Sequence, residues 1–363
     1  MPSKNLNAIT KTTIFTKNSL LLWVIIVFFI SACGNELEFN NTTTTTAVSV
    51  STLAGSGVQG AINGTGIYAT FYEPTGVAVD AAGNVYVADY RNSLIRKINA
   101  AGSVTTLAGG NSAGFANGTG SYALFNLPTG VAVDAAGNVY VADNNNNLIR
   151  EISSAGAVTT LAGSGAQGGT NGPVAGASFN YPQGVAVDAS GNVYVADYGN
   201  NLIRKISTAG LVTTLAGKDS AGANNGVDTV ATFNQPTSVA VDAGGNVYVA
   251  DEGNNLIREI SPAGVVSTFA GSGAQGATNG TGTKASFNGP TGVAVDASGN
   301  VYVADYGNNL VRKISPAGVV TTLGSTTTGN SKLFKGPYGV AVDAAGNVYV
   351  ADYGYSTILK ISK

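Results

Sequence analysis

Histidine is absent from this sequence of 363 residues, which also contains only one cysteine, one methionine and one tryptophan. Without an imidazole, Ser-His-Asp and Cys-His catalysis and zinc sites with a histidine ligand are excluded. A single cysteine excludes a disulfide bond within the chain. Charged residues are also scarce, at 10% against about 25% in ordinary soluble domains. The net charge of −2 is unlike the basic footprint of nucleic-acid-binding proteins, so we expect no nucleic-acid partner.

The N-terminal residues have the composition of a targeting signal. Residues 1–19 contain three lysines and no acid, and the apolar run LLLWVIIVFFI occupies residues 20–30. A basic region followed by an apolar run and small residues is typical of a secretory signal peptide. The 11 residues of this run fall short of the about 20 that a membrane-spanning helix needs. An uncleaved membrane helix is the alternative interpretation.

The segment ISAC, which ends at Cys33, resembles the bacterial lipobox, where the signal is cut before a cysteine that becomes lipidated. The resemblance implies a lipoprotein signal peptide at residues 1–32 and a lipid anchor on Cys33. It places the protein in a bacterial cell envelope, periplasmic or surface-exposed, and Gly34 in place of aspartate favours the outer membrane. A free or buried thiol is the alternative. Residues 33–47 include five consecutive threonines and predict a flexible Thr-rich tether.

The remaining residues, 48–363, repeat one unit six times. The segment GVAVD, once as SVAVD, recurs with its first valine at positions 77, 131, 185, 239, 293 and 340, so most copies are 54 residues apart and the last two 47. Each copy contains four apolar segments, such as GVAVD, NVYVAD, NLIRKIS and VTTLAG. Their β-branched and aromatic residues nearly alternate with others, and Gly, Asn, Asp or Pro bounds each segment. This pattern predicts four antiparallel strands per copy, which make one propeller blade.

The number of strand copies predicts how the ring closes. The chain ends after the third segment of the last copy, ILKIS, while an additional fourth segment, VSTLAG, precedes the first copy at residues 50–55. We therefore expect an all-β fold, a six-bladed β-propeller of four-stranded antiparallel blades with 24 strands, in which the N-terminal strand completes the last blade. The tight turns should lie on one face, and the D-Y-G-N-N connections and interblade links on the other, long-loop face. Phenylalanines that recur in the links, from Phe71 to Phe334, should lie in the core.

The repeat resembles the NHL family, on segments such as PTGVAVDAAGNVYVADYRNSLIRKI at residues 74–98 and PTGVAVDASGNVYVADYGNNLVRKI at residues 290–314. The resemblance implies a rigid disc that binds partners on one face. Members of the family include protein-binding and RNA-binding scaffolds, sensor domains and an amidating lyase with a metal site. The lyase depends on histidine and the RNA binders on basic faces, and this sequence has neither.

Twelve aspartates recur at two positions of the repeat. A ring of carboxylates around a central channel could bind Ca²⁺, which takes oxygen ligands. We favour a structural role, because the first aspartate lies in a D-A-A-G-N-like turn and the second precedes an arginine by seven residues, which predicts an ion pair. Leu359 replaces that arginine in the last copy. No cofactor or metal site is therefore expected. The two sets are Asp80, Asp134, Asp188, Asp242, Asp296 and Asp343, and Asp89, Asp143, Asp197, Asp251, Asp305 and Asp352.

The candidate binding residues are those at which the six copies differ on the long-loop face. They follow the second aspartate or flank the proline that begins the first strand. Exposed tyrosines and amides with few charges suit peptides or sugars, because aromatic faces pack on apolar surfaces and amides form hydrogen bonds. Drift among tolerant loop positions is the alternative. The residues are Tyr90, Asn144, Tyr198, Glu252, Tyr306, Tyr353, Glu73, Tyr181, Gln183, Gln235 and Tyr338.

These features favour a non-catalytic scaffold that binds a protein or peptide, or a carbohydrate, through the long-loop face. The membrane would be contacted only through the lipid anchor. One alternative is a lyase or lactonase-like propeller enzyme that depends on a metal and carboxylates. Glu73 and Glu252 are the acids of the mouth outside the repeated pattern, and two carboxylates do not define a reaction. The other alternative is a structural spacer.

Overall fold

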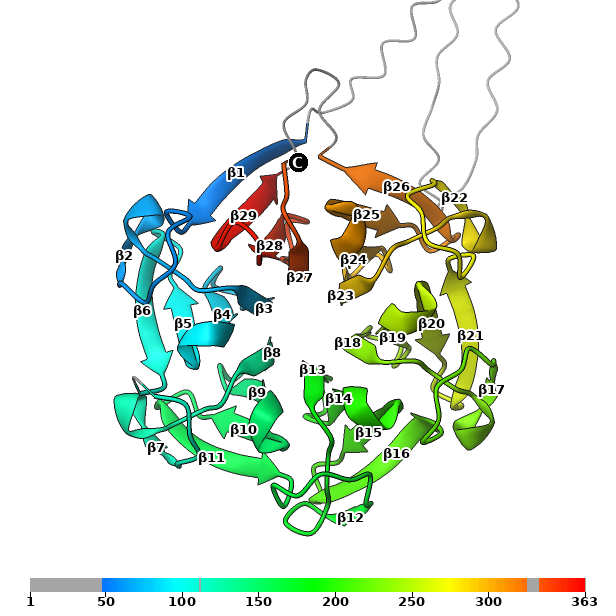
Figure 1. Ribbon diagram of the computed structural model, residues 1–363, viewed down its shortest axis with the longest axis horizontal. Helices are drawn as coiled ribbons and strands as arrows, with labels where there is room; N and C mark the ends of the chain where they lie inside the picture. The colour runs from blue at the N-terminus through cyan, green and yellow to red at the C-terminus, as the bar shows by residue number, and fades with distance from the viewer. Residues whose placement is uncertain (1–47, 111, 325–332, 363) are drawn as a thin grey trace, which may run out of the picture. The chain divides into compact units, whose positions relative to one another are not determined.

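The computed structural model describes residues 48–110, 112–324 and 333–362, which belong to one compact unit, Thr46–Lys363. Six antiparallel sheets surround a central axis as the blades of a propeller (Figure 1). The expected signal peptide, tether and lipidated Cys33 lie outside the described residues. Within the described ranges, no helix combines the length and the apolar character that a membrane crossing requires.

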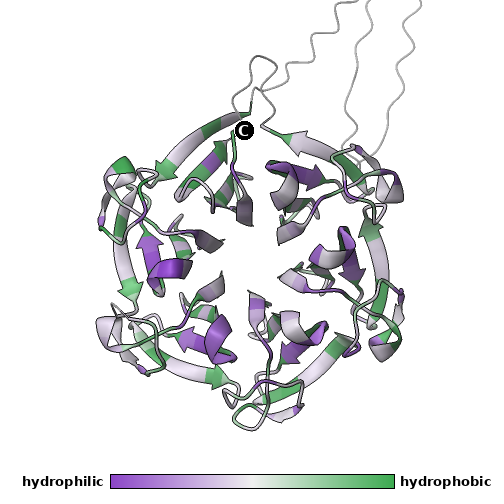
Figure 2. Cartoon of the chain, in the orientation of Figure 1, coloured by the Kyte–Doolittle hydropathy of each residue, from purple (hydrophilic) through white to green (hydrophobic). Residues whose placement is uncertain are grey.

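Each blade places its strands outward from the axis in chain order. In blade 1, β3 (Pro74–Val79) is innermost and is followed by β4 (Val85–Asp89), β5 (Leu94–Ile98) and β6 (Ser103–Ala108). These are the four strands that the repeat predicts. Figure 2 shows apolar and polar residues in alternating bands along the outer strands, as strands that pack on one face require.

The other blades repeat this order. The equivalent strands are β8 (Pro128–Val133), β9 (Val139–Asp143), β10 (Leu148–Ile152) and β11 (Ala157–Ala162) in blade 2; β13 (Pro182–Val187), β14 (Val193–Asp197), β15 (Leu202–Ile206) and β16 (Leu211–Gly217) in blade 3; β18 (Pro236–Val241), β19 (Val247–Asp251), β20 (Leu256–Ile260) and β21 (Val265–Ala270) in blade 4; β23 (Pro290–Val295), β24 (Val301–Asp305), β25 (Leu310–Ile314) and β26 (Val319–Leu323) in blade 5; and β27 (Pro337–Val342), β28 (Val348–Asp352) and β29 (Thr357–Ser362) in blade 6.

Five blades contain a fifth strand that the sequence did not predict. A two-residue strand of the interblade link pairs with the outer strand of the blade that follows, as β2 does with β6 (Gly64↔Val104 and Thr65↔Ser103). The 24 strands expected from the repeat all form, and these five additions bring the number in the described residues to 29. These short strands cover an otherwise free sheet edge, and two residues cannot show an apolar alternation. They are β2 (Gly64–Thr65), β7 (Gly118–Thr119), β12 (Gly172–Pro173), β17 (Gly226–Val227) and β22 (Gly280–Thr281).

The predicted closure of the ring is confirmed. The N-terminal strand β1 (Ser49–Ala54) pairs antiparallel with β29, from Ser49↔Ser362 to Ala54↔Ile358, as the outer strand of blade 6. The first and last strands of the described chain therefore share one sheet, and their pairing closes the ring.

The hydrophobic core consists of six clusters, and each lies between two neighbouring blades. In the cluster between blades 6 and 1, Val77 and Val87 of blade 1 pack against Ala341 and Tyr349 of blade 6, with the buried Phe71 of the link beside them. All six recurring phenylalanines are buried, which confirms that they belong to the core. A substitution in one blade therefore acts on its neighbour as well.

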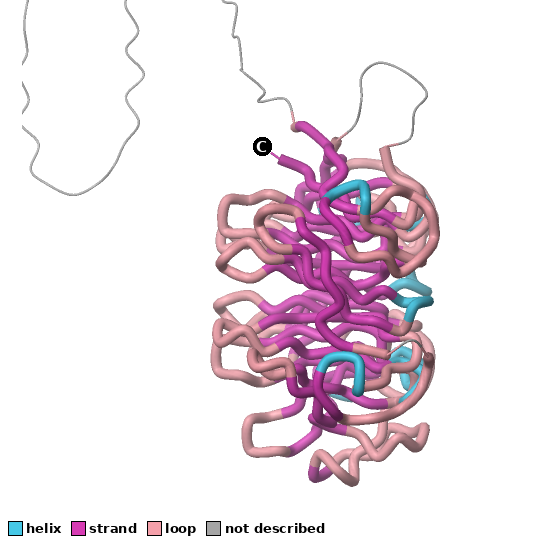
Figure 3. The backbone as a smooth tube through the Cα atoms, turned by 90° about the vertical axis from the view of Figure 1, so that its left-hand side faces the viewer, coloured by secondary structure: helices cyan, strands magenta, loops and turns pink. Residues whose placement is uncertain are grey.

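The two kinds of connection lie at opposite faces (Figure 3). The tight turns form as predicted: the Asp80 carboxylate accepts hydrogen bonds from the backbone N–H of Ala82 and Asn84, and Gly83 adopts a φ of +80°. At the long-loop face, a 3-10 turn joins the second and third strands. These turns are η2 (Tyr90–Asn92), η4 (Asn144–Asn146), η5 (Tyr198–Asn200), η7 (Glu252–Asn254) and η9 (Tyr306–Asn308). Four more, η1 (Gly66–Tyr68), η3 (Gly120–Tyr122), η6 (Asp228–Val230) and η8 (Gly282–Lys284), lie in the links.

The predicted ion pairs form inside the first five blades. Arg96 Nη1 lies 2.7 Å from Asp89 Oδ2, and both side chains are fully buried. The guanidinium also donates to the carbonyls of Ile62 and Thr70 and to the Asn63 amide oxygen, so it fastens the interblade link to the blade. The equivalent pairs are Asp143 with Arg150, Asp197 with Arg204, Asp251 with Arg258, and Asp305 with Arg312.

Close packing around the axis depends on a glycine at the third residue of the innermost strand. A Cβ atom at Gly339 would overlap the carbonyl oxygen of Thr75 in the neighbouring blade. We expect Gly339→Ala to lower the stability by about 1–3 kcal/mol, because the overlap must be relieved by moving a strand. Denaturant unfolding measures the loss. The matched control is Ser238→Ala, at the equivalent position of blade 4, where the structure already holds a side chain. Equal effects of the two variants would contradict this explanation.

Candidate functional site

The long-loop face is held in place by the buried aspartates. Asp89 accepts hydrogen bonds from the backbone N–H of Tyr72 and from the Asn92 amide, at 2.8 and 2.9 Å. The turn η2 begins directly after this aspartate, and Ser93 ends it in the left-handed conformation. Because the aspartate is fixed inside the blade, the residue after it, Tyr90, is directed toward the mouth of the ring. Blades 2 to 5 repeat this arrangement, whereas in blade 6 the described hydrogen bonds to Asp352 come from the backbone N–H groups of Lys335 and Tyr355.

The mouth of the ring contains a cavity of about 280 Å³, which we call the mouth cavity. Its lining combines the residues after the buried aspartates with the second residues of the innermost strands. Seven of the eleven candidate residues line it: Tyr90, Asn144, Gln183, Glu252, Tyr306, Tyr338 and Tyr353. Thr75, Thr129 and Thr291 complete the lining. These threonines were not among the candidates, although they occupy the same position after the proline as Gln183 and Tyr338.

Three tyrosines of blades 5 and 6 form an aromatic cluster in the mouth cavity. The ring of Tyr306 lies edge-on to those of Tyr338 and Tyr353, with centroids 5.9 and 6.3 Å apart, and the latter two rings are 6.1 Å apart. A Cβ atom at Gly336 would approach the Tyr306 ring to 2.9 Å. The glycine in the link before β27 therefore makes room for this cluster.

A hydrogen bond between two lining residues of the mouth cavity crosses the ring. Tyr338 Oη donates to Gln183 Oε1 at 2.7 Å. The two residues belong to β27 and β13, in blades that face each other across the axis (Figure 1). Threonine occupies the equivalent position in the other four blades. Burial raises the pKa of Tyr338 well above its ordinary value, and the charge of Glu252 raises it further, so the hydroxyl keeps its proton.

The two candidate glutamates differ in their surroundings. Burial acts to raise the pKa of Glu73, but hydrogen bonds from Tyr353 and Arg91 lower it below the ordinary value. The distances from Glu73 Oε2 are 2.6 Å to Tyr353 Oη and 2.7 Å to Arg91 Nε. Glu252 accepts no side-chain hydrogen bond or ion pair from the described residues, and burial raises its pKa to about 7. Glu252 is thus the carboxylate in the described lining that is open to a ligand.

Four candidate residues do not line the mouth cavity. Tyr181 and Gln235 are exposed, and both adopt a positive φ before the proline, at 49° and 55°. Their backbone N–H groups donate to the asparagine that ends the 3-10 turn of the preceding blade, as Tyr181 does to Asn147 at 3.0 Å. Tyr198 is partly buried, and its pKa is raised by burial and by Glu252, which places it near that carboxylate. Glu73 does not line the cavity, but it accepts a hydrogen bond from the hydroxyl of Tyr353, which does.

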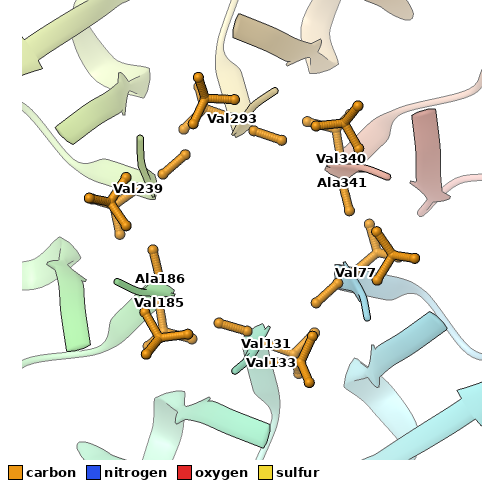
Figure 4. A pocket seen from close by; sticks show the side chains of 18 residues that line it. Val77, Val131, Val133, Val185, Ala186, Val239, Val293, Val340 and Ala341 are labelled. Atoms are coloured by element: carbon orange, nitrogen blue, oxygen red, sulfur yellow. The ribbon is translucent and has the colours of Figure 1, made fainter. Parts of the chain in front are cut away.

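The suggested ring of Ca²⁺-binding carboxylates does not form. The central channel, of about 220 Å³, is lined by the Val-Ala-Val segments of the six innermost strands, such as residues 77–79 (Figure 4). One set of aspartates is buried inside the blades, with an arginine partner in five of them, and the other set caps the tight turns. Among the described residues, no three Asp, Glu, His or Cys side chains are grouped to hold a metal ion. The carboxylates that were suggested to surround the channel lie inside the blades and in the tight turns instead.

Comparisons with known proteins agree with this architecture. The model of the NHL repeat matches residues 71–98, 125–152, 179–206, 233–260 and 287–314. The protein SUPPRESSOR OF QUENCHING 1, chloroplastic, of Arabidopsis thaliana is 31% identical in an alignment of 281 residues that covers 72% of this chain. The chain spans only 27% of that relative's length.

Two solved structures illustrate the range of proteins that share the fold. An auxiliary nutrient binding protein of Bacteroides thetaiotaomicron superposes with a TM-score of 0.63 at 15% identity, over 86% of this chain and 76% of that one. A gluconolactonase of Xanthomonas campestris superposes with a TM-score of 0.59 at 13% identity, over 86% and 89% of the two chains. At these identities the likeness establishes the fold alone.

Proposed function

We propose, from the premise that the chain is an NHL-repeat protein folded as a six-bladed β-propeller, that it is a non-catalytic binding module. It would hold part of a protein or peptide, or a carbohydrate, in the mouth cavity. The observation that carries this proposal is the convergence on one cavity of seven residues at which the blades differ. Because hydrogen bonds to buried aspartates hold the turns that carry several of these residues, as Asp89 does beside Tyr90, a ligand would lose little free energy to ordering the backbone of the site.

We further propose that the propeller is displayed in a bacterial cell envelope, at the outer membrane, by a lipid on Cys33. The lipobox-like segment ISAC and the basic and apolar residues before it support this location. A binding module on a tether suits capture of ligands outside the cytoplasm. The auxiliary nutrient binding protein of similar fold is consistent with such a role.

The enzyme alternative has less support in the geometry of the site. A gluconolactonase shares the fold, and a carboxyl group with a pKa of about 7, such as that of Glu252, can act as a general base. A second catalytic group is needed beside it. Glu73 is engaged by Arg91 and Tyr353, so the described mouth offers one available carboxylate.

A panel of small ligands tests the binding module. Saturation-transfer NMR on the purified protein, with mono- and disaccharides and with capped tripeptides of neutral, acidic and basic character, should detect at least one binding class. The double variant Tyr306→Ala, Tyr353→Ala should lose that signal, because it removes two walls of the mouth cavity. Tyr68→Ala with Tyr122→Ala is the matched control, since these tyrosines are 78% and 83% exposed in the links.

Two results would overturn the proposal. One is that no ligand class binds, or that the mouth variant and the control behave alike, which would favour the spacer. The other is formation of a hydrolysed or eliminated product from a lactone in the presence of Mg²⁺ or Ca²⁺, which would favour an enzyme.

A further inference from the structure

We propose that the mouth cavity is a site for an organic ammonium ion, either a free alkylamine or the side chain of a lysine. The Glu252 carboxylate would be the counter-ion, and the faces of Tyr306, Tyr338 and Tyr353 would form the walls. This inference rests on the proposed function and names the chemical class of its ligand.

The charge balance of the mouth cavity favours a cation. Its lining contains one acid, Glu252, and no lysine or arginine. Arg91, which lies close by, is bound to Glu73 at 2.7 Å. A carboxylate that is partly removed from water and lacks a partner gains more from a cationic ligand than an exposed one does. A neutral or anionic ligand would leave this charge uncompensated.

Five of the ten lining residues also favour a ligand that donates hydrogen bonds. The hydroxyl groups of Thr75, Thr129 and Thr291 donate to backbone carbonyls of the next blade, at 2.8–2.9 Å. The hydroxyls of Tyr338 and Tyr353 donate to Gln183 and Glu73. Each of these five hydroxyl groups already donates its one proton, so toward the cavity it can only accept a hydrogen bond. An ammonium group has three donors and no acceptor, which complements them.

The aromatic cluster and the size of the cavity further restrict the kinds of ligand that fit. Tyrosine rings attract a cation over their faces by about 0.5–2 kcal/mol, more when water is excluded. The volume of about 280 Å³ lies below the usual range for drug-sized ligands. It suits a single alkyl chain with its terminal ammonium. Glu252 and the tyrosine cluster lie in different blades, so the ligand would bridge them.

Binding should depend on pH through Glu252. Burial raises its pKa to about 7, so the carboxyl is ionised at pH 8 and protonated at pH 5. Binding needs the ionised form, and the affinity should therefore fall by about tenfold per pH unit below 7. The titratable groups near it are Tyr198 and Tyr338, whose pKa values are raised. Neither ionises in this range, and the Glu73–Arg91 pair keeps its charges.

Calorimetric titration of the purified protein with n-butylamine at pH 8 tests the inference, with n-butanol and butyrate as neutral and anionic analogues. Butylammonium should bind at least tenfold more tightly than either. Glu252→Gln should reduce its affinity at least tenfold and abolish the pH dependence. Glu259→Gln, in the third strand of the same blade and outside the cavity lining, is the matched control and should bind as the unchanged protein does. Unfolding curves confirm that both variants are folded.

The two sources of the ammonium group are distinguished by a second ligand, Nα-acetyl-lysine amide. Tighter binding than that of butylamine assigns the site to a lysine of a peptide, and weaker binding assigns it to a free amine. Equal affinity of butylamine and butanol, or no effect of Glu252→Gln, would overturn the inference. If sugars or acidic peptides bind and amines do not, the ammonium assignment fails while the binding module stands. If nothing binds, both fail.

Discussion

Removal of residues 48–55 will lower the melting temperature by on the order of 10 °C or more and will promote association of the protein. These residues contain β1, whose five residue pairs with β29 close blade 6. At about 1 kcal/mol for each ladder hydrogen bond, the loss is roughly 5 kcal/mol, out of a total that is typically 5–15 kcal/mol. Val50 and Leu53 also pack on two of the core clusters. The freed edge of β29 would be open to pairing with other chains.

Calorimetry and size-exclusion chromatography measure these effects. A chain that lacks residues 40–47 instead is the length-matched control, and it should melt as the unchanged protein does. A peptide with the sequence of residues 48–55 should raise the melting temperature of the shortened protein, because it can take the empty strand position. An unchanged melting temperature after the deletion would show that the β1–β29 pairing contributes little to closure.

Arg96→Ala should destabilise the protein by about 3–5 kcal/mol, the usual result of leaving a buried charge without its partner. Asp89 would remain inside blade 1 with two hydrogen bonds and no counter-ion. The link residues 62–63 and 70 would also lose the hydrogen bonds that they accept from the Arg96 guanidinium. We therefore expect the long-loop face beside blade 1 to become more open to hydrogen exchange.

Arg91→Ala is the control for this prediction, since it removes an exposed arginine from the same blade. Its pair with Glu73 has a 46% exposed arginine side chain, and exposed pairs contribute about 0–1 kcal/mol. Denaturant unfolding of the two variants gives the comparison. Similar losses would mean that burial of the Arg96 pair has no special effect. In blade 6, where Leu359 replaces the arginine, backbone N–H groups of Lys335 and Tyr355 hold Asp352.

The sequence predicts most of the architecture because each blade is determined locally. The alternation of residues within GVAVD and NVYVAD defines strands. The spacing of seven residues between Asp89 and Arg96 places the two side chains as diagonal neighbours on the same face of the hairpin. The extra VSTLAG segment at the N-terminus predicts the closure. Each of these inferences depends only on residues close together in the sequence or on the number of repeated segments. Six copies of the repeat give the same answer.

The parts of the site that the sequence could not predict depend on the geometry of the whole ring. Tyr338 and Gln183 are 155 residues apart and meet only because their blades lie opposite each other. Tyr181 and Gln235 occupy a loop position similar to that of lining residues, but the left-handed backbone before the proline holds them outside the cavity. Glycine occupies the equivalent positions 289 and 336, and this is the sequence feature that could have indicated a left-handed backbone there.

The pairing of β1 with β29 also sets the order in which the molecule can be completed. Ser49 and its partner Ser362 lie near opposite ends of the chain, so the first strand to be synthesised waits for the last before it gains its partner. Blades 1 to 5 can form their own sheets as they emerge, whereas blade 6 cannot be completed until β29 has been synthesised. The unpaired β1 segment is exposed throughout that interval, and Ser49, Ser51 and Thr52 of SVSTLA limit the apolar surface that it presents.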